Sequence, residues 1–151
     1  MTKQSSVLVA EDDAQDAFLL KRAFLKTGIN TIINFVRDGQ KVIDYLEGKK
    51  LFADRNLHPF PDLLLLDLKM PKLDGFDVLV WLRNQTGLKR LITVVLTSSN
   101  LPTDVNRAYD LGANSYLVKS EIGEFMRLAK TIGDYWLDSN ECPDCQTQGS
   151  N

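Results

Sequence analysis

The sequence predicts an α/β protein in which a parallel sheet is covered by helices on both faces. Short apolar runs alternate five times with segments of helical periodicity. The central run, Leu63–Leu66, consists of four consecutive leucines, as expected for a short strand buried on both faces. Such alternation is typical of strands joined by crossover helices. We therefore expect one α/β domain.

The apolar runs are the expected strands. They are four to six residues long and rich in leucine, β-branched or aromatic residues: Ser6–Ala10, Thr31–Val36, Leu63–Leu66, Leu91–Leu96 and Ser115–Val118. Pro71 follows the third run and prevents further ladder pairing. Right-handed crossovers leave few topologies, and the five-stranded flavodoxin-like order 2-1-3-4-5 is the expected one.

The segments between these runs have helical spacing. The first helix is expected over Ala14–Lys26, with Phe18 and Leu25 beside its apolar face and Gly28 as its cap. The others are marked by Val42, Ile43 and Leu46, by a start at Asp74-Gly75, by Thr103–Leu111, and by a stripe of Phe125, Leu128, Ala129, Ile132 and Trp136. Gly48–Pro61 is expected to be a longer, looser connection containing His58.

Composition narrows the classes of function. The 151 residues are 44% hydrophobic and 25% charged, which suits one globular domain, expected over 1–138 with a polar tail over 139–151. A net charge of −2 gives no support for nucleic-acid binding. No apolar run has the length of a membrane span, and no signal-peptide core is seen. The two cysteines, both near the C-terminus, suggest no disulfide framework, so the cytoplasm is expected.

Polar residues end four of the strands at one edge. In the order 2-1-3-4-5, strands 1, 3, 4 and 5 lie side by side, and ligands of open α/β sheets bind at the carboxyl ends of the strands. The residues at these ends are Glu11, Asp12, Asp67, Thr97, Ser98 and Lys119. Three carboxylates, two hydroxyls and one ammonium are therefore expected to meet.

This set of groups indicates phosphoryl chemistry. Clustered carboxylates repel one another unless a cation neutralises them, and hard oxygen ligands favour Mg²⁺. Asp67, at the end of the central strand, can attack phosphorus as a nucleophile. Lys119 and Thr97 can bind the transferred group, and the small Ser98 leaves room for it.

Each of these residues, taken singly, also fits a structural role as a turn residue, a helix cap or a solvated strand end. Asp13 and Asp16 are expected to do no more than stabilise the start of the first helix. Structural roles for the others require several coincidences at matching strand ends, so the functional interpretation is preferred.

With these residues in these positions, the chain resembles the receiver domains of two-component response regulators over about residues 6–138. The motifs that carry the resemblance are Glu11-Asp12, Asp67-x-x-Met70-Pro71-x-x-Asp74-Gly75, Thr97-Ser98 and Tyr116-x-x-Lys119. The long connection before the third strand, Lys119-Ser120, and the ending Tyr135-Trp136-Leu137 are similar to single-domain response regulators associated with phytochromes.

The resemblance implies that Asp67 accepts phosphate from a histidine of a sensor kinase. The similarity to phytochrome-associated regulators implies that this kinase is of the phytochrome type. It implies Mg²⁺ ligation by Asp12, Asp67 and the backbone carbonyl of Lys69, with Glu11 acting through a metal-bound water. Such a protein is a phosphoacceptor that assists its own phosphorylation and dephosphorylation, and is not otherwise an enzyme.

The resemblance also implies a switch. Thr97 and Lys119 would contact the phosphoryl group, and Tyr116 would turn inward when Thr97 moves. The fourth helix, fifth strand and fifth helix would then form a face for contact with a downstream protein or for a homodimer. Tyr109 and Tyr135-Trp136-Leu137 make that face aromatic, although Trp136 also fits a role in sealing the edge of the domain.

One departure affects the fifth strand. The family usually has proline after this lysine in a cis peptide, whereas Ser120 follows Lys119, and a cis bond before a non-proline residue costs about 3 kcal/mol. The loop after the fifth strand therefore either keeps a strained cis bond or takes another path. Lys69 and Ser99 occupy rim positions, and substituting either is expected to change the lifetime of the phosphorylated state.

Two other classes of function compete. A phosphatase with an aspartyl nucleophile requires an acid two residues after Asp67, where Lys69 stands. A flavin-binding module requires neutral donors after the first strand, where Glu11 and Asp12 would repel a flavin phosphate. The cysteines, Cys142 and Cys145, form a lone CxxC in the tail and are expected to be spectators, with redox or intermolecular chemistry as the alternative.

Overall fold

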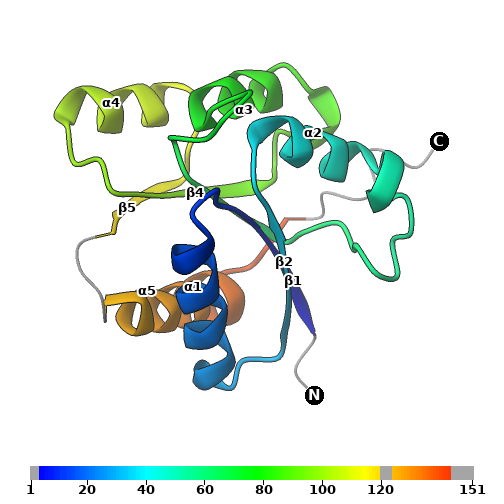
Figure 1. Cartoon of the computed structure of the whole chain (residues 1–151), viewed down its shortest axis with the longest axis vertical. Coiled ribbons are helices and arrows are strands. Elements are labelled where there is room, and N and C mark those ends of the chain that lie inside the picture. The colour runs from blue at the N-terminus through cyan, green and yellow to red at the C-terminus, as the bar shows by residue number, and fades with distance from the viewer. Residues whose placement is uncertain (1–3, 120–123, 144–151) are drawn as a thin grey trace.

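The sheet has the expected topology. The structure is a computed structural model, and it describes residues 4–119 and 124–143. Within these ranges five parallel strands form one sheet in the order β2-β1-β3-β4-β5 (Figure 1). The strands are β1 (Ser5–Ala10), β2 (Thr31–Val36), β3 (Leu63–Leu66), β4 (Ile92–Thr97) and β5 (Ser115–Val118). The expected strands are confirmed to within one residue at each end.

The helices form two layers. They are α1 (Ala14–Thr27), α2 (Gly39–Glu47), α3 (Gly75–Arg83), α4 (Pro102–Asp110) and α5 (Glu124–Ile132). Short 3-10 turns, η1 (Lys50–Phe52) and η2 (Thr86–Leu88), and a π-helical segment, η3 (Gly133–Ser139), complete the described elements. Figure 1 shows α1 and α5 on one face of the sheet and α2, α3 and α4 on the other.

The leucine run of β3 contributes to both layers of core. Leu64 and Leu66 pack in the cluster formed with α2, α3 and α4, whereas Leu63 and Leu65 pack in the cluster formed with α1 and α5. Successive side chains of a strand point to opposite faces, so a strand with a helical layer on each side needs apolar residues throughout. All four leucines are buried, which holds the end of β3 rigidly at the centre of the sheet.

Helix α1 begins and ends as its sequence predicts. The Asp13 side chain accepts from the Asp16 backbone N–H at 3.0 Å, and Gly28 closes the helix in the left-handed conformation with φ 74°. Leu20 and Phe24 are buried. Phe18 and Leu25 lie on the solvent side and are 63% and 70% exposed, so they form no part of the core.

The connection between α2 and β3 is more ordered than the expected loose loop. The Arg55 guanidinium donates hydrogen bonds to the backbone carbonyls of Tyr45, Leu46 and His58, at 2.8, 3.0 and 3.2 Å. The Tyr45 hydroxyl donates to the carbonyl of Pro59 at 2.9 Å. Arg55 therefore adds a donor to the last carbonyls of α2, where the Tyr45 carbonyl also accepts from the Gly48 backbone N–H at 3.0 Å.

The loop from β3 to α3 is fixed by a capping box and a close approach. Asp74 and Asp77 each accept from the other's backbone N–H, at 2.9 and 3.0 Å. The Gly75 backbone N–H donates to the Leu68 carbonyl at 2.9 Å. A Cβ at Gly75 would lie 2.8 Å from Leu68 Cα, so only glycine allows this approach.

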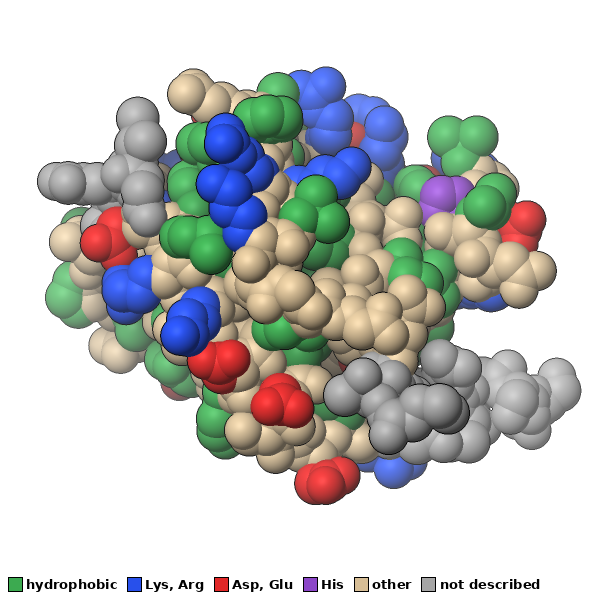
Figure 2. All heavy atoms as spheres, turned by 90° about the horizontal axis from the view of Figure 1, so that it is seen from below, with side chains coloured by type: hydrophobic (Ala, Val, Ile, Leu, Met, Phe, Trp, Pro, Cys, Tyr) green, Lys and Arg blue, Asp and Glu red, His purple; other side chains and the backbone are tan. Residues whose placement is uncertain are grey.

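The surface carries mixed charge. Figure 2 shows one face on which basic, acidic and hydrophobic side chains are interspersed. Trp136 and Leu137 pack against the core cluster of α1 and α5, in agreement with a sealing role for Trp136. Among the residues that the structure describes, no helix combines the length and apolar character needed to cross a membrane.

Candidate functional site

Backbone hydrogen bonds hold the ends of neighbouring strands level with one another. The backbone N–H of Asp67 donates to the Ala10 carbonyl at 3.1 Å, and that of Lys119 donates to the Thr97 carbonyl at 2.7 Å. Glu11 is fixed in the same way by the Val36 carbonyl, at 3.0 Å. The parallel register thus brings the predicted residues to one edge of the sheet.

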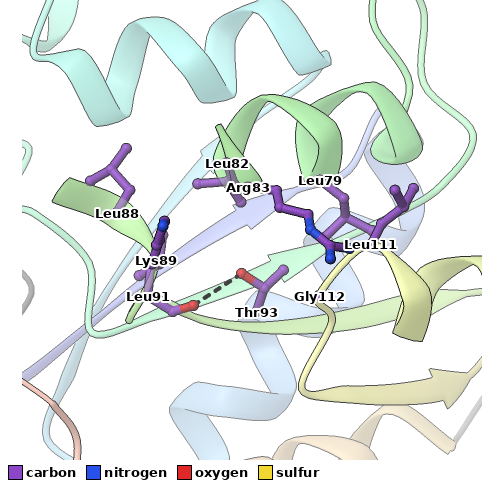
Figure 3. Close-up of a pocket in the computed structure, with 9 residues that line it drawn as sticks. All are labelled: Leu79, Leu82, Arg83, Leu88, Lys89, Leu91, Thr93, Leu111 and Gly112. Carbon is purple, nitrogen blue, oxygen red and sulfur yellow. Dashed lines mark hydrogen bonds between the residues drawn. The ribbon is translucent and has the colours of Figure 1, made fainter. Parts of the chain in front are cut away.

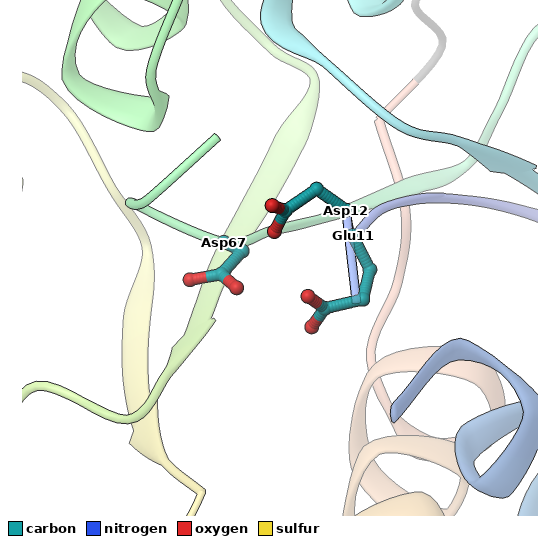
Figure 4. Close-up of side chains that lie close together, drawn as sticks. All are labelled: Glu11, Asp12 and Asp67. Atoms are coloured by element: carbon teal, nitrogen blue, oxygen red, sulfur yellow. The ribbon is translucent and has the colours of Figure 1, made fainter. Parts of the chain in front are cut away.

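Three carboxylates meet at this edge. Oxygens of Glu11, Asp12 and Asp67 all lie within 4.8 Å of one another, and Figure 4 shows the three groups facing a common space. Glu11 is 4% exposed and Asp67 6% exposed, so neither carboxylate is well screened by solvent. Hard oxygen donors at this spacing suit a small divalent cation.

Lys119 is the cation that the chain itself supplies. Its Nζ donates to Glu11 Oε1 at 2.7 Å, to Asp16 Oδ2 at 3.0 Å and to Asp67 Oδ2 at 3.2 Å. An ammonium group has three N–H donors, and these contacts employ all of them. The Lys119 side chain is 11% exposed, so the contacts are largely shielded from water.

Burial and charge act on the pKa values of these groups in opposite directions. Burial raises the pKa of Glu11 to about 7, against the lowering effect of the Lys119 hydrogen bond, and the negative charge of Asp67 adds to the rise. Burial alone lowers the pKa of Lys119, but its bond to Glu11 and the charges of Asp67 and Glu11 outweigh burial. Lys119 is therefore held protonated.

Asp16 corrects the sequence prediction. It was expected to act only at the start of α1, yet its carboxylate contacts Lys119, whereas Asp13 does cap the helix as expected. Helical side chains lean toward the N-terminus, so an acid at the third position of α1 points back toward the end of β1. That position suits the stabilisation of a helix start equally well, so the contact with Lys119 has no specific sign in the sequence.

Thr97 lies at the same edge of the sheet, at the end of β4. The residue is fully buried, and its Oγ1 has no hydrogen-bond partner among residues 4–119 and 124–143. A buried hydroxyl without a partner carries a free-energy cost unless a ligand or water satisfies it. Ser98, the next residue, is exposed. The hydroxyl and the acidic cluster fit a site for a metal ion and an anionic group.

Hydrogen bonds of Tyr116 and Ser99 fix the loop that follows Thr97. The Tyr116 hydroxyl donates to the Ser99 carbonyl at 2.9 Å, and Ser99 Oγ hydrogen-bonds Asp104 Oδ2 at 2.6 Å. Burial raises the pKa of the Tyr116 hydroxyl, so it remains a donor. The loop that follows β4 is therefore anchored from both β5 and α4.

Lys69 is exposed at the rim of the site. Its backbone N–H donates to Asp67 Oδ1 at 3.4 Å. Together with Asp12 and Met70 it lines a hollow of about 620 Å³ that reaches α4 at Asp104 and Arg107. The hollow gives an approach to the carboxylates from the side of the β3–α3 loop.

A separate hollow of about 410 Å³ lies near the opposite end of β4 (Figure 3). Leucines form much of its lining, with Arg83 and Lys89 also present, and none of the predicted site residues lines it. The Arg83 guanidinium is bonded to the Asp110 carbonyl, which leaves it less available to an anion.

Two expectations fall on residues outside the described ranges. The path of the chain at Ser120 and the position of Cys145 both lie there. Cys142 is described, and its Sγ donates to the Trp136 carbonyl at 3.6 Å. The expectation that the CxxC pair is a spectator stays a prediction.

Comparison with known proteins agrees with this arrangement. The chain is 36% identical over 138 residues to the probable methanogenesis regulatory protein FilR2 of Methanothrix harundinacea, covering 91% of this chain and 86% of that protein. It is 32% identical over 138 residues to the response regulator Rcp1 of Synechocystis, covering 91% and 92%.

Solved structures agree in fold. The phosphorylated cyanobacterial phytochrome response regulator RcpA superposes with a TM-score of 0.86 at 31% identity, over 94% of this chain and all of that one. The Mn²⁺-bound form of Rcp1 gives 0.84 at 31% identity, over 93% and 99%. Residues 7–130 match the family described as the response regulator receiver domain. The chain belongs to the response regulator receiver domain family.

Proposed function

We propose that Asp67 is the phosphoacceptor of a two-component phosphorelay and receives its phosphoryl group from a phosphohistidine of a sensor kinase. The observation that carries this proposal is the contact of the buried Asp67 carboxylate with the Lys119 ammonium, beside Glu11 and Asp12. The Asp67 carboxylate, at the buried end of β3, therefore lies beside a fixed positive charge and among carboxylates that can bind a metal ion.

The donor set suits Mg²⁺. Asp12 and Asp67 offer carboxylate oxygens that would hold the ion. The Lys69 backbone carbonyl would be the third ligand, and Glu11 would act through a water on the ion. The Mn²⁺-bound form of the relative Rcp1 supports a divalent cation in this fold. Magnesium would neutralise the clustered carboxylates and the oxygens of an incoming phosphoryl group, which would otherwise repel one another.

In the transfer step an oxygen of Asp67 forms a bond to phosphorus while the bond from phosphorus to the histidine nitrogen breaks, and the imidazole leaves with the electron pair of that bond. Lys119 stabilises charge on the phosphoryl oxygens, and the Thr97 hydroxyl, which has no partner among the described residues, donates to one of them. Movement of Thr97 opens space for Tyr116, whose hydroxyl gives up its bond to Ser99.

The output is a protein contact. The face formed by α4, β5 and α5 presents Tyr109, 48% exposed, and changes when Tyr116 turns inward. A second copy of the chain, forming a homodimer, or a downstream protein binds there, and neither a nucleic acid nor a membrane is the target.

The receiver domain spans 1–138, 139–151 form a tail, and the protein acts in the cytoplasm. The relatives' names favour a phytochrome-type kinase as partner.

The alternative, a phosphatase with an aspartyl nucleophile, is not favoured. It requires a carboxylate two residues beyond Asp67 as general acid and base, and Lys69 stands there, exposed at the rim. The phosphoryl group is therefore held on the protein and lost slowly, without turnover of other substrates.

The test is incubation with acetyl phosphate and Mg²⁺, followed by intact-protein mass measurement. Wild type should gain one phosphoryl group and Asp67→Asn none. Asp62→Asn is a matched control, because Asp62 lies just before β3, at the end away from the site, and accepts from the Ser6 backbone N–H. Equal incorporation in wild type and Asp67→Asn, or none in either, would contradict the proposal.

A further inference from the structure

An ion pair connects Asp16 to the site. Its Oδ2 accepts from Lys119 Nζ at 3.0 Å, across 103 positions of sequence, and joins the first turn of α1 to the end of β5. The Asp16 side chain is 31% exposed, whereas that of Lys119 is 11% exposed. Solvent therefore reaches the Asp16 carboxylate more easily than the Lys119 ammonium.

The three acceptors of Lys119 differ in what else they must do. Glu11 and Asp67 both belong to the acidic cluster, and Asp67 is also the proposed nucleophile. Asp16 is the one acceptor of the three outside that cluster. Once a cation and a phosphoryl group draw on the oxygens of Glu11 and Asp67, Asp16 is the partner of Lys119 that remains.

We propose that Asp16 is a positioning residue that holds the Lys119 ammonium against the phosphorylation site. This inference rests on the proposed function of Asp67. With one N–H held by Asp16, the other two are directed at Glu11 and Asp67, and the one at Asp67 lies where a phosphoryl oxygen would receive it. Loss of Asp16 leaves a long, flexible side chain with a weaker anchor and a poorer orientation in the transfer step.

The chain offers a matched control in Asp13. Both acids lie at the start of α1, three residues apart. The Asp13 side chain accepts from the Asp16 backbone N–H, whereas the Lys119 ammonium donates to Glu11, Asp16 and Asp67. Asparagine caps a helix about as well as aspartate, so Asp13→Asn keeps the cap and removes the same charge as Asp16→Asn. The difference between the two variants isolates the contact with Lys119.

The kinetic arm compares phosphorylation by acetyl phosphate at saturating Mg²⁺. Both variants remove one negative charge near the site, so both are expected to lower the donor concentration at half-maximal rate by a similar factor. Asp16→Asn alone should lower the rate constant at saturating donor, by about fivefold for the loss of one partly shielded charge contact. Urea unfolding of both variants checks that each is folded.

The second arm uses metal-free, unphosphorylated protein and does not depend on the proposed function. The ammonium protons of Lys119, observed by NMR at Nζ, should exchange slowly in wild type and in Asp13→Asn and faster in Asp16→Asn. If the two variants match in exchange and in saturating rate, Asp16 serves only the helix and the inference is wrong. If no protein is phosphorylated while exchange differs as expected, the contact stands and the proposed function fails.

Discussion

Replacing Gly75 with alanine tests how tightly the β3–α3 loop holds the site. The added Cβ would lie 2.8 Å from Leu68 Cα and would also meet the carbonyl oxygen of Asp67. Carbon atoms pack at about 3.5–4.0 Å, so the backbone must move by about 1 Å. These neighbours are main-chain atoms and cannot rotate away. The expected loss of stability is about 1–3 kcal/mol, as for other overpacked sites.

The same displacement should impair phosphorylation, because the carbonyl that is pushed belongs to Asp67 itself. A misplacement of about 1 Å lowers rates by up to about a hundredfold, so a loss of at least about tenfold is expected with acetyl phosphate and Mg²⁺. Urea unfolding gives the stability, and the initial rate of phosphoryl incorporation gives the effect on the site.

Gly28→Ala is the control for the glycine change. Within residues 4–119 and 124–143 a Cβ there meets nothing within 4 Å, but the φ of 74° makes alanine strained, at a cost of about 1 kcal/mol. Gly28 closes α1 away from the site, so stability should fall while phosphorylation is unchanged. Unaltered stability and rate in Gly75→Ala would refute the reasoning that this approach positions Asp67.

Three further changes have defined outcomes. Lys69→Ala should change the decay rate of phosphorylated protein without weakening Mg²⁺ binding, and an unchanged decay rate rules out a rim role. Ser99→Ala should also change that decay rate, because it removes the bond to Asp104 that anchors the loop after β4; unaltered decay would show that the anchor has no influence. Tyr45→Phe should reduce the loss of stability at alkaline pH, because burial raises the pKa of Tyr45 to about 12. The stability that the protonated Tyr45 hydroxyl contributes is complete below pH 10 and is lost as the pH rises through about 12. It amounts to something on the order of 2 kcal/mol. Urea midpoints at pH 8 and pH 11.5 measure it, and equal losses in both proteins contradict the assignment.

The sheet could be predicted because its local signals agree with its tertiary environment. A run such as Leu63–Leu66 has no polar face, which requires a helical layer on each side, and the structure supplies both. Strand ends then align through the register, so the meeting of Glu11, Asp12 and Asp67 followed from topology. Turn chemistry at Asp74 and Gly28 marked the helix boundaries.

Side-chain contacts between distant elements could not be read in this way. Asp16 fits a helix start by local criteria, and only the folded structure brings it to Lys119, 103 positions away in the sequence. Arg55 likewise gave no local sign that it would bond the carbonyls of Tyr45 and Leu46. The exposure of Phe18 and Leu25 depends on the width of the face that α5 covers, which periodicity does not specify.

The central claim, that Asp67 carries the phosphoryl group, is tested most directly by trapping the acyl phosphate. Protein treated with acetyl phosphate and Mg²⁺ is reduced with borohydride, which converts a phosphorylated aspartate to homoserine, and is then sequenced by mass spectrometry. Homoserine at position 67, dependent on Mg²⁺ and on the phosphodonor, is the predicted result. Homoserine at another acid such as Asp12, or none at position 67 in protein that has gained a phosphoryl group, would contradict the account.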